Sequence, residues 1–125
     1  MRYAVSVLGM LLASAVVVGC GGSEEGFSGV TLDSRVGELS DDDMHALCTW
    51  VIGQQGGEGA MHDCGGGLSV TLDTVNECVA EQGDYSDCTL TVAQMEDCVL
   101  DAGANPCQAP STPACEPLGA CLFGP

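Results

Sequence analysis

Cysteine content is the feature that most constrains this chain, because nine of its 125 residues are cysteine. Apart from Cys20, all of them lie between residues 48 and 121. These eight residues are Cys48, Cys64, Cys78, Cys88, Cys98, Cys107, Cys115 and Cys121. An even set of cysteines in a short exported chain predicts that all are paired in disulfides, and sequence alone leaves about a hundred pairings open. We therefore expect a small fold that covalent cross-links hold together.

The amino terminus has the pattern of an export signal. Arg2 precedes an apolar run that ends at Val18, and glycines and acidic residues follow from Gly21. The run is shorter than the ~20 apolar residues that a membrane-spanning helix needs. We therefore expect residues 1–19 to be a signal peptide, with a retained membrane helix as the alternative. Export would place the cysteines in an oxidising compartment, where disulfides persist.

The four residues Val17-Val18-Gly19-Cys20 resemble the lipobox of bacterial lipoproteins. In that family a peptidase cleaves before the cysteine, whose thiol carries diacylglycerol and whose amine is acylated, for example by palmitate. The resemblance implies a mature chain that begins at Cys20 and a membrane anchor that gains ~0.8 kcal/mol per buried CH₂. Gly21 after the cysteine implies, by the sorting rule of these lipoproteins, the outer membrane. The alternative is an ordinary signal peptide, with Cys20 as a further framework cysteine.

The strong negative charge excludes several classes of function. The chain has 18 acidic residues, two arginines and no lysine, which gives a formal net charge of -16. A Walker-type phosphate loop and Schiff-base chemistry both need a lysine, and binding to nucleic acid or anionic lipid needs a basic surface. We therefore expect no nucleic-acid partner, and membrane attachment through the lipid anchor alone.

Composition divides the rest of the chain at about residue 38. Residues 20–38 are rich in glycine and serine and show no sustained apolar period, so we expect a flexible tether. The alternative is that the strand-forming residues 30–32 pack on the domain. Residues 39–125 hold the eight clustered cysteines and form the expected cysteine-rich helical domain.

Three Ser or Thr residues, each preceded by an apolar residue, predict the starts of three short helices. The expected N-caps are Ser40, Thr71 and Thr91, and the expected helices span residues 41–54, 72–82 and 92–102. Gln94 completes a capping box after Thr91, and each helix has a cysteine on its apolar face. The prediction is an all-α fold, a small disulfide-stapled bundle of about three short helices with a loop-rich C-terminal segment. That segment has room for one short helical turn near residues 117–122.

Several segments together carry a wider resemblance. They are the lipobox, residues 39–50, Glu77-Cys78-Val79, residues 88–92 and Pro113-Ala114-Cys115. With these, most of the chain resembles the small cysteine-rich lipoproteins of myxobacteria. The resemblance implies an envelope lipoprotein and carries no activity with it, because that family supplies no catalytic motif.

A zinc site is the sharpest chemical alternative. His45 and Cys48 lie three residues apart on the first expected helix, and His62 and Cys64 follow a glycine-rich turn. These are the ligand types that zinc prefers. Their spacing matches no common zinc module, and thiols in an oxidising compartment favour disulfides. We therefore expect no metal or other cofactor, and solvated histidines.

Catalysis finds little support in the sequence. No Gly-x-Ser-x-Gly motif occurs, and the two histidines provide few general bases. The acidic run at residues 41–43 suits a helix N-terminus and lacks the alternating spacing of a calcium loop. Trp50 is expected to cover the core, with an exposed binding role as the alternative.

The expected function is a structural or interaction module of the cell envelope, not an enzyme, with an envelope protein as its partner. The alternative is an inhibitor of a hydrolase, which would present a rigid loop between bridged cysteines. Residues 109–114 are the only proline-stiffened candidate for such a loop.

Overall fold

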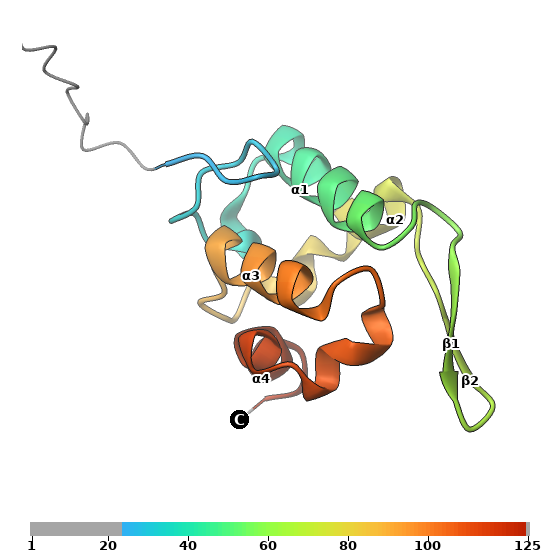
Figure 1. The fold of residues 1–125 in the computed structure, drawn as a ribbon. Helices are drawn as coiled ribbons and strands as arrows, with labels where there is room; N and C mark the ends of the chain where they lie inside the picture. The colour runs from blue at the N-terminus through green and yellow to red at the C-terminus, as the bar shows by residue number, and fades with distance from the viewer. Residues whose placement is uncertain (1–23, 125) are drawn as a thin grey trace, which may run out of the picture.

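The computed structural model describes residues 24–124. The signal peptide, the lipobox and Cys20 lie outside these residues. Within them the chain forms a mostly helical domain with one two-stranded hairpin (Figure 1). In this part of the chain, none of the helices has both the length and the apolar character needed to cross a membrane.

Helix α1 (Asp41–Gln54) has the predicted bounds and the predicted cap. The Ser40 hydroxyl oxygen accepts a hydrogen bond of 3.2 Å from the Asp43 backbone nitrogen. Three aspartates occupy the first turn, where the helix dipole favours negative charge. The helix buries the face that carries Met44, Leu47, Cys48 and Ile52.

Helix α2 (Val75–Ala80) is shorter than predicted, and the expected start at residue 72 is wrong. Its N-cap is Thr74, not Thr71, and Glu77 completes a capping box with Thr74. Thr71 instead ends a strand. The 3-10 helix η2 (Glu81–Tyr85) follows directly, so the chain stays helical up to Tyr85 without forming one continuous α-helix.

The hairpin of strands β1 (Met61–Gly65) and β2 (Leu68–Thr71) was not predicted, and the expectation of an all-α fold is wrong here. The strands are antiparallel, with His62 opposite Val70. Gly65, Gly66 and Gly67 all have positive φ, between 62° and 84°, which other residues rarely adopt. This glycine run permits the tight reversal, and the hairpin extends away from the helices (Figure 1).

Helix α3 (Val92–Ala102) has the predicted bounds, and the predicted capping box of Thr91 and Gln94 is confirmed. It lies between α1 and the C-terminal helix α4 (Glu116–Phe123) (Figure 1). The C-terminal segment is more regular than predicted, because the 3-10 helices η3 (Pro106–Ser111) and η4 (Pro113–Cys115) precede α4. Prolines occupy the first turns of all three elements, where a missing backbone N–H costs nothing.

Residues 24–38 pack on the domain, so the flexible tether is wrong for this part of the expected segment. Val30 and Val36 belong to the main hydrophobic core. The backbone nitrogen of Val36 donates a 2.8 Å hydrogen bond to the Leu90 carbonyl oxygen, and η1 (Val36–Glu38) follows. The alternative of a packed segment is the one that the structure shows.

All eight cysteines between residues 48 and 121 form disulfides, as predicted. The pairs are Cys48–Cys78, Cys64–Cys107, Cys88–Cys121 and Cys98–Cys115. They join α1 to α2, the hairpin to η3, the segment after η2 to α4, and α3 to η4. Every main element is therefore cross-linked to another one.

Candidate functional site

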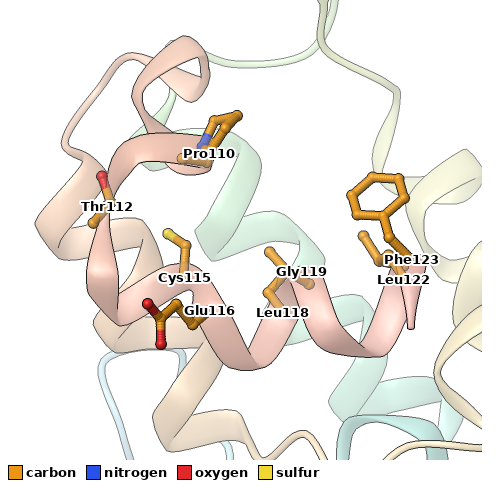
Figure 2. Close-up of a pocket in the computed structure, with 9 residues that line it drawn as sticks. Pro110, Thr112, Cys115, Glu116, Leu118, Gly119, Leu122 and Phe123 are labelled. Atoms are coloured by element: carbon orange, nitrogen blue, oxygen red, sulfur yellow. The ribbon is translucent and has the colours of Figure 1, made fainter. Parts of the chain in front are cut away.

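A surface groove of about 380 Å³ lies along the C-terminal helices (Figure 2). We call it the C-terminal groove. Its lining residues are Ala109, Pro110, Thr112, Cys115, Glu116, Leu118, Gly119, Leu122 and Phe123. Most of this surface is apolar, and the Phe123 side chain is 88% exposed. Large apolar groups on a soluble surface mark interaction sites when they gather in one place.

Disulfides hold the groove in shape. Cys98–Cys115 fixes the end of η4 to α3, and Cys88–Cys121 fixes α4 near its C-terminus. Between η3 and η4, the Thr112 hydroxyl donates a 2.7 Å hydrogen bond to the Gln108 carbonyl oxygen. The walls are therefore preorganised, which lowers the entropic cost of binding.

The groove lies on a strongly acidic domain. Glu116 is the only charged residue among those that line it. Arg35 is the only Lys or Arg residue in the described region, and both of its terminal nitrogens already have partners. Its Nη1 lies 2.8 Å from a Glu38 carboxylate oxygen, and its Nη2 donates a 2.7 Å hydrogen bond to the Cys88 carbonyl oxygen. The field around the groove therefore favours a cationic partner.

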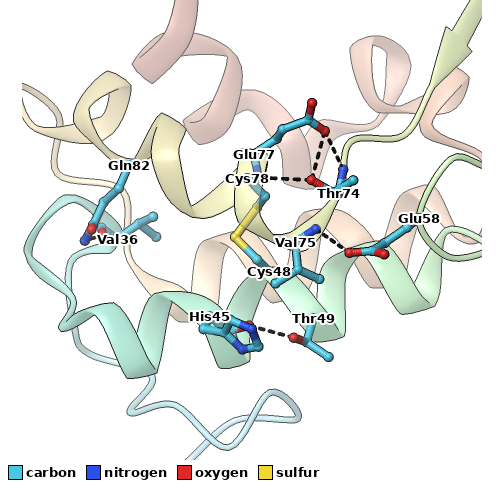
Figure 3. The surroundings of a disulfide bond; sticks show 10 residues. All are labelled: Val36, His45, Cys48, Thr49, Glu58, Thr74, Val75, Glu77, Cys78 and Gln82. Atoms are coloured by element: carbon cyan, nitrogen blue, oxygen red, sulfur yellow. Dashed lines mark hydrogen bonds between the residues drawn. A yellow bond between two sulfur atoms is a disulfide. The ribbon is translucent and has the colours of Figure 1, made fainter.

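The four residues of the zinc alternative do not form a site. Cys48 is bonded to Cys78 (Figure 3), and Cys64 is bonded to Cys107. His45 is exposed, whereas the His62 ring Nε2 lies 2.7 Å from the Gln55 carbonyl oxygen. Residues 24–124 contain no group of three or more His, Cys, Asp or Glu residues placed to hold a metal. The zinc alternative is therefore wrong, because disulfides occupy both of its sulfur atoms.

The candidate inhibitor loop, residues 109–114, is not an extended loop. Apart from Thr112, which links the two, its residues belong to η3 and η4. A segment that binds along a cleft or a strand edge presents an extended backbone, with its hydrogen-bonding groups free. Only Thr112 within residues 109–114 has an extended backbone, and helical turns flank it, so the geometry gives the inhibitor alternative no support.

Trp50 combines features of both expected roles. It is half-buried, and its ring stacks on Phe27 with a centroid distance of 6.3 Å and an interplanar angle of 15°. Phe27 itself is 74% exposed. The N-terminal segment thus provides a partner for Trp50 that the sequence analysis did not predict.

Sequence reasoning also missed the C-terminal groove. Leu118 and Leu122 are spaced i, i+4 after Pro117, which is a local signal for a short helix with one apolar face. No protein-family model matches this chain, and comparison with curated proteins and with solved structures gave no match either. The function is therefore argued from geometry, charge and sequence pattern.

Proposed function

We propose that this protein is a lipid-anchored interaction module of the cell envelope, attached to the outer membrane through Cys20. The sequence at residues 17–20 supports the anchor through its resemblance to a lipobox. The four disulfides support an oxidising compartment, because such cross-links are rare where thiols are kept reduced. The interaction itself takes place in the C-terminal groove.

One observation carries the interaction: Phe123 is 88% exposed at the edge of a preorganised apolar groove. Leu122 beside it is 41% exposed. Covering apolar surface gains about 25 cal/mol per Å², so a partner that covers both side chains gains several kcal/mol before its ordering costs. Aromatic side chains beside a pocket are typical contributors to binding energy.

The partner that fits is a protein segment with apolar side chains flanked by lysine or arginine. Its apolar residues fill the groove, and its cations meet Glu116 and the acidic domain around it. A second copy of this chain is a poor occupant, because two bodies with 18 acids each repel one another.

Binding of two matched synthetic peptides tests the groove. One peptide alternates leucine and lysine, and the other alternates leucine and glutamate. We expect the lysine peptide to bind at moderate salt and the glutamate peptide not to bind. Phe123→Ala should weaken binding at least tenfold. Leu100→Ala, which removes an exposed leucine from α3 outside the groove, should leave it unchanged. Equal affinity of wild type and Phe123→Ala would reject the groove as the binding site.

The anchor is tested separately with labelled fatty acid. We expect label in the wild-type protein and none in Cys20→Ala, because the thiol and amine of that residue carry the acyl chains in lipoproteins. A Cys20→Ala protein that still carries the label would overturn the anchor and leave the groove result untouched.

A further inference from the structure

A second cavity, of about 260 Å³, lies inside the domain between α1 and α3. The two helices contribute Met44, Leu47 and Val51 on one side and Met95 and Val99 on the other. Leu118 lines both this cavity and the C-terminal groove, so it forms part of the wall between them. We call this space the core cavity.

The core cavity, of about 260 Å³, is much larger than a water molecule. Protein interiors are close-packed, and voids larger than a water molecule are few and reduce stability. Here disulfides fix the surrounding walls: Cys48, Cys78 and Cys98 all line the space. Cys48–Cys78 joins α1 to α2, and Cys98–Cys115 joins α3 to η4. These cross-links limit how far the helices can shift to close the cavity.

The lining of the core cavity is uncharged. Among residues 24–124, no acidic residue and no arginine lines it. Its polar side chains are those of Gln55 and Tyr85. The Tyr85 hydroxyl is neutral at physiological pH, because tyrosine ordinarily titrates near pH 10 and burial, followed by the nearby Glu81 and Asp84, raises this pKa further.

The cavity also has a route to solvent. Val51, Gln55, Tyr85 and Pro106 are half-buried, whereas Met44, Leu47 and Val99 are buried. The cavity thus has an apolar interior and partly exposed, partly polar edges. This is the usual arrangement of a small-molecule site, in which apolar walls provide affinity and a few polar groups set orientation.

We propose that the core cavity binds a small neutral amphiphile, with an apolar body the size of an aromatic ring or a short alkyl chain and one hydroxyl or carbonyl group. A dry apolar cavity of about 150 Å³ is enough for benzene. The Gln55 amide and the Tyr85 hydroxyl provide the hydrogen bonds for the polar end. An anion is disfavoured by the acidic domain, and a cation by the absence of any carboxylate in the lining.

Methionine methyl groups provide the test, because Met44 and Met95 line the core cavity whereas Met61 is 74% exposed on the hairpin. The probe is 1-octanol, added to the whole exported and oxidised chain with ¹³C-labelled methionine methyls. We expect saturable shifts at Met44 and Met95 and none at Met61. Octanoate at pH 7 should bind at least tenfold more weakly. Shifts at all three methyls would show that octanol adsorbs to the surface. The absence of any saturable shift would show that the cavity binds no ligand. Either result overturns the proposal, as does equal affinity for octanol and octanoate.

Two variants on α3 separate the cavity from the rest of the helix. Val99→Phe fills the core cavity and should weaken octanol binding at least tenfold. Leu100→Phe adds a ring at the neighbouring exposed position, which does not line the cavity, and should leave binding unchanged. Unchanged affinity in a folded Val99→Phe protein would overturn the proposal. If that variant does not fold, the methyl shifts of the wild type decide.

Discussion

The Glu96 carboxylate, in the middle of α3, accepts a 3.0 Å hydrogen bond from the backbone nitrogen of Phe27. It also accepts hydrogen bonds from the backbone nitrogen and the hydroxyl of Ser28, at 2.9 and 2.6 Å. Glu96 is only 2% exposed, and a buried charged group is costly unless hydrogen bonds compensate it. These three donors provide that compensation. They also make the N-terminal segment part of the domain.

The first prediction concerns this contact. Glu96→Gln replaces one carboxylate oxygen with an NH₂ group, which faces backbone donors and cannot accept from them. We expect a loss of roughly 1 to 3 kcal/mol in the free energy of unfolding, since charge-assisted bonds are replaced by a mismatch. Urea denaturation with the disulfides intact measures the loss. Hydrogen exchange should speed up first at the amides of Phe27 and Ser28.

Asp97→Asn is the matched control, because Asp97 is the exposed neighbour of Glu96 on the same helix. It should leave both stability and exchange unchanged. Gly26→Ala should reproduce the effect of Glu96→Gln, because a Cβ at this glycine would collide with the Glu96 carboxylate. Wild-type exchange rates at residues 27 and 28 in the Glu96→Gln protein would contradict this account.

The contact between Phe27 and Glu96 also shows what could not be predicted from the sequence. The two residues are 69 positions apart, and pairing over such a distance leaves no local pattern. Helix starts were predicted correctly where the N-cap residue is followed by other residues that favour a first turn. Ser40 is followed by three aspartates, and Thr91 is followed by Gln94, which completes a capping box. The prediction of a flexible tether is wrong for residues 24–38 because their apolar side chains pack individually on the domain and show no period in the sequence.

The second helix shows how two local signals compete. Thr71 and Thr74 both precede helix-forming residues, but only Thr74 has a glutamate three positions later to complete a capping box. Thr71 instead lies at the end of strand β2, where it pairs with Met61 of strand β1. The hairpin itself was missed because its strands are short and largely exposed, and only its glycine turn gave a signal. The C-terminal groove depends on which cysteines pair, and spacing alone does not determine that.

The second prediction is an acid sensitivity of α2. Hydrogen bonds from the Thr74 backbone nitrogen and hydroxyl lower the pKa of Glu77 below its ordinary value of 4.5. Since the folded-state pKa is lower than the unfolded one, this cap stabilises α2 fully above about pH 4.5, and the effect is lost as pH falls through the folded pKa. We expect the two amides of the capping box, those of Thr74 and Glu77, to lose protection from exchange in that range.

Helix α3 is the internal control for this experiment, because its capping box uses Gln94, which does not titrate. Its first-turn amides should keep their protection through the same pH range. Glu77→Gln should remove the pH dependence at the amides of residues 74 and 77, since the glutamine side chain does not titrate either. Parallel loss of protection in α2 and α3 would show general acid unfolding and reject a specific role for Glu77.

The third prediction concerns alkaline pH. Burial is the largest cause that raises the pKa of Tyr85, followed by Glu81 and Asp84. Because the pKa of Tyr85 is higher in the folded protein than in the unfolded one, Tyr85 contributes fully to stability below the unfolded-state pKa of about 10. This contribution is lost as pH rises through the folded-state pKa. The only other tyrosine, Tyr3, lies in the expected signal peptide. Absorbance of tyrosinate in the mature chain should therefore report Tyr85 alone.

We expect the native protein to titrate above the midpoint of the urea-unfolded protein. Tyr85→Phe should abolish the absorbance change and reduce the fall in stability above pH 10. The Glu81→Gln protein should show a smaller upward shift, because one of the two nearby negative charges is gone. Coincident midpoints in the folded and unfolded proteins would contradict the burial of this hydroxyl.

The last prediction concerns the order in which reductant opens the disulfides. Both residues of Cys98–Cys115 are buried, and buried Cys48 is bonded to half-buried Cys78. Both residues of Cys64–Cys107 and of Cys88–Cys121 are half-buried. Thiol–disulfide exchange needs direct attack on a sulfur atom, so access controls its rate. We expect mild reductant to open Cys64–Cys107 and Cys88–Cys121 first, with most helical circular dichroism retained. Opening Cys48–Cys78 and Cys98–Cys115 should then unfold the domain, because each disulfide contributes typically ~2 to 4 kcal/mol and a core of this size provides little more. Trapping with iodoacetamide and mass mapping gives the order.

Paired serine variants provide the control. Replacing both Cys64 and Cys107 with serine should free the hairpin and leave the helices folded, whereas Cys48→Ser with Cys78→Ser should unfold α1 and α2. A metal chelator should change neither spectrum nor thiol count. Reduction of the fully buried Cys98–Cys115 before the two half-buried pairs would mean that the domain opens globally before any single disulfide is reached.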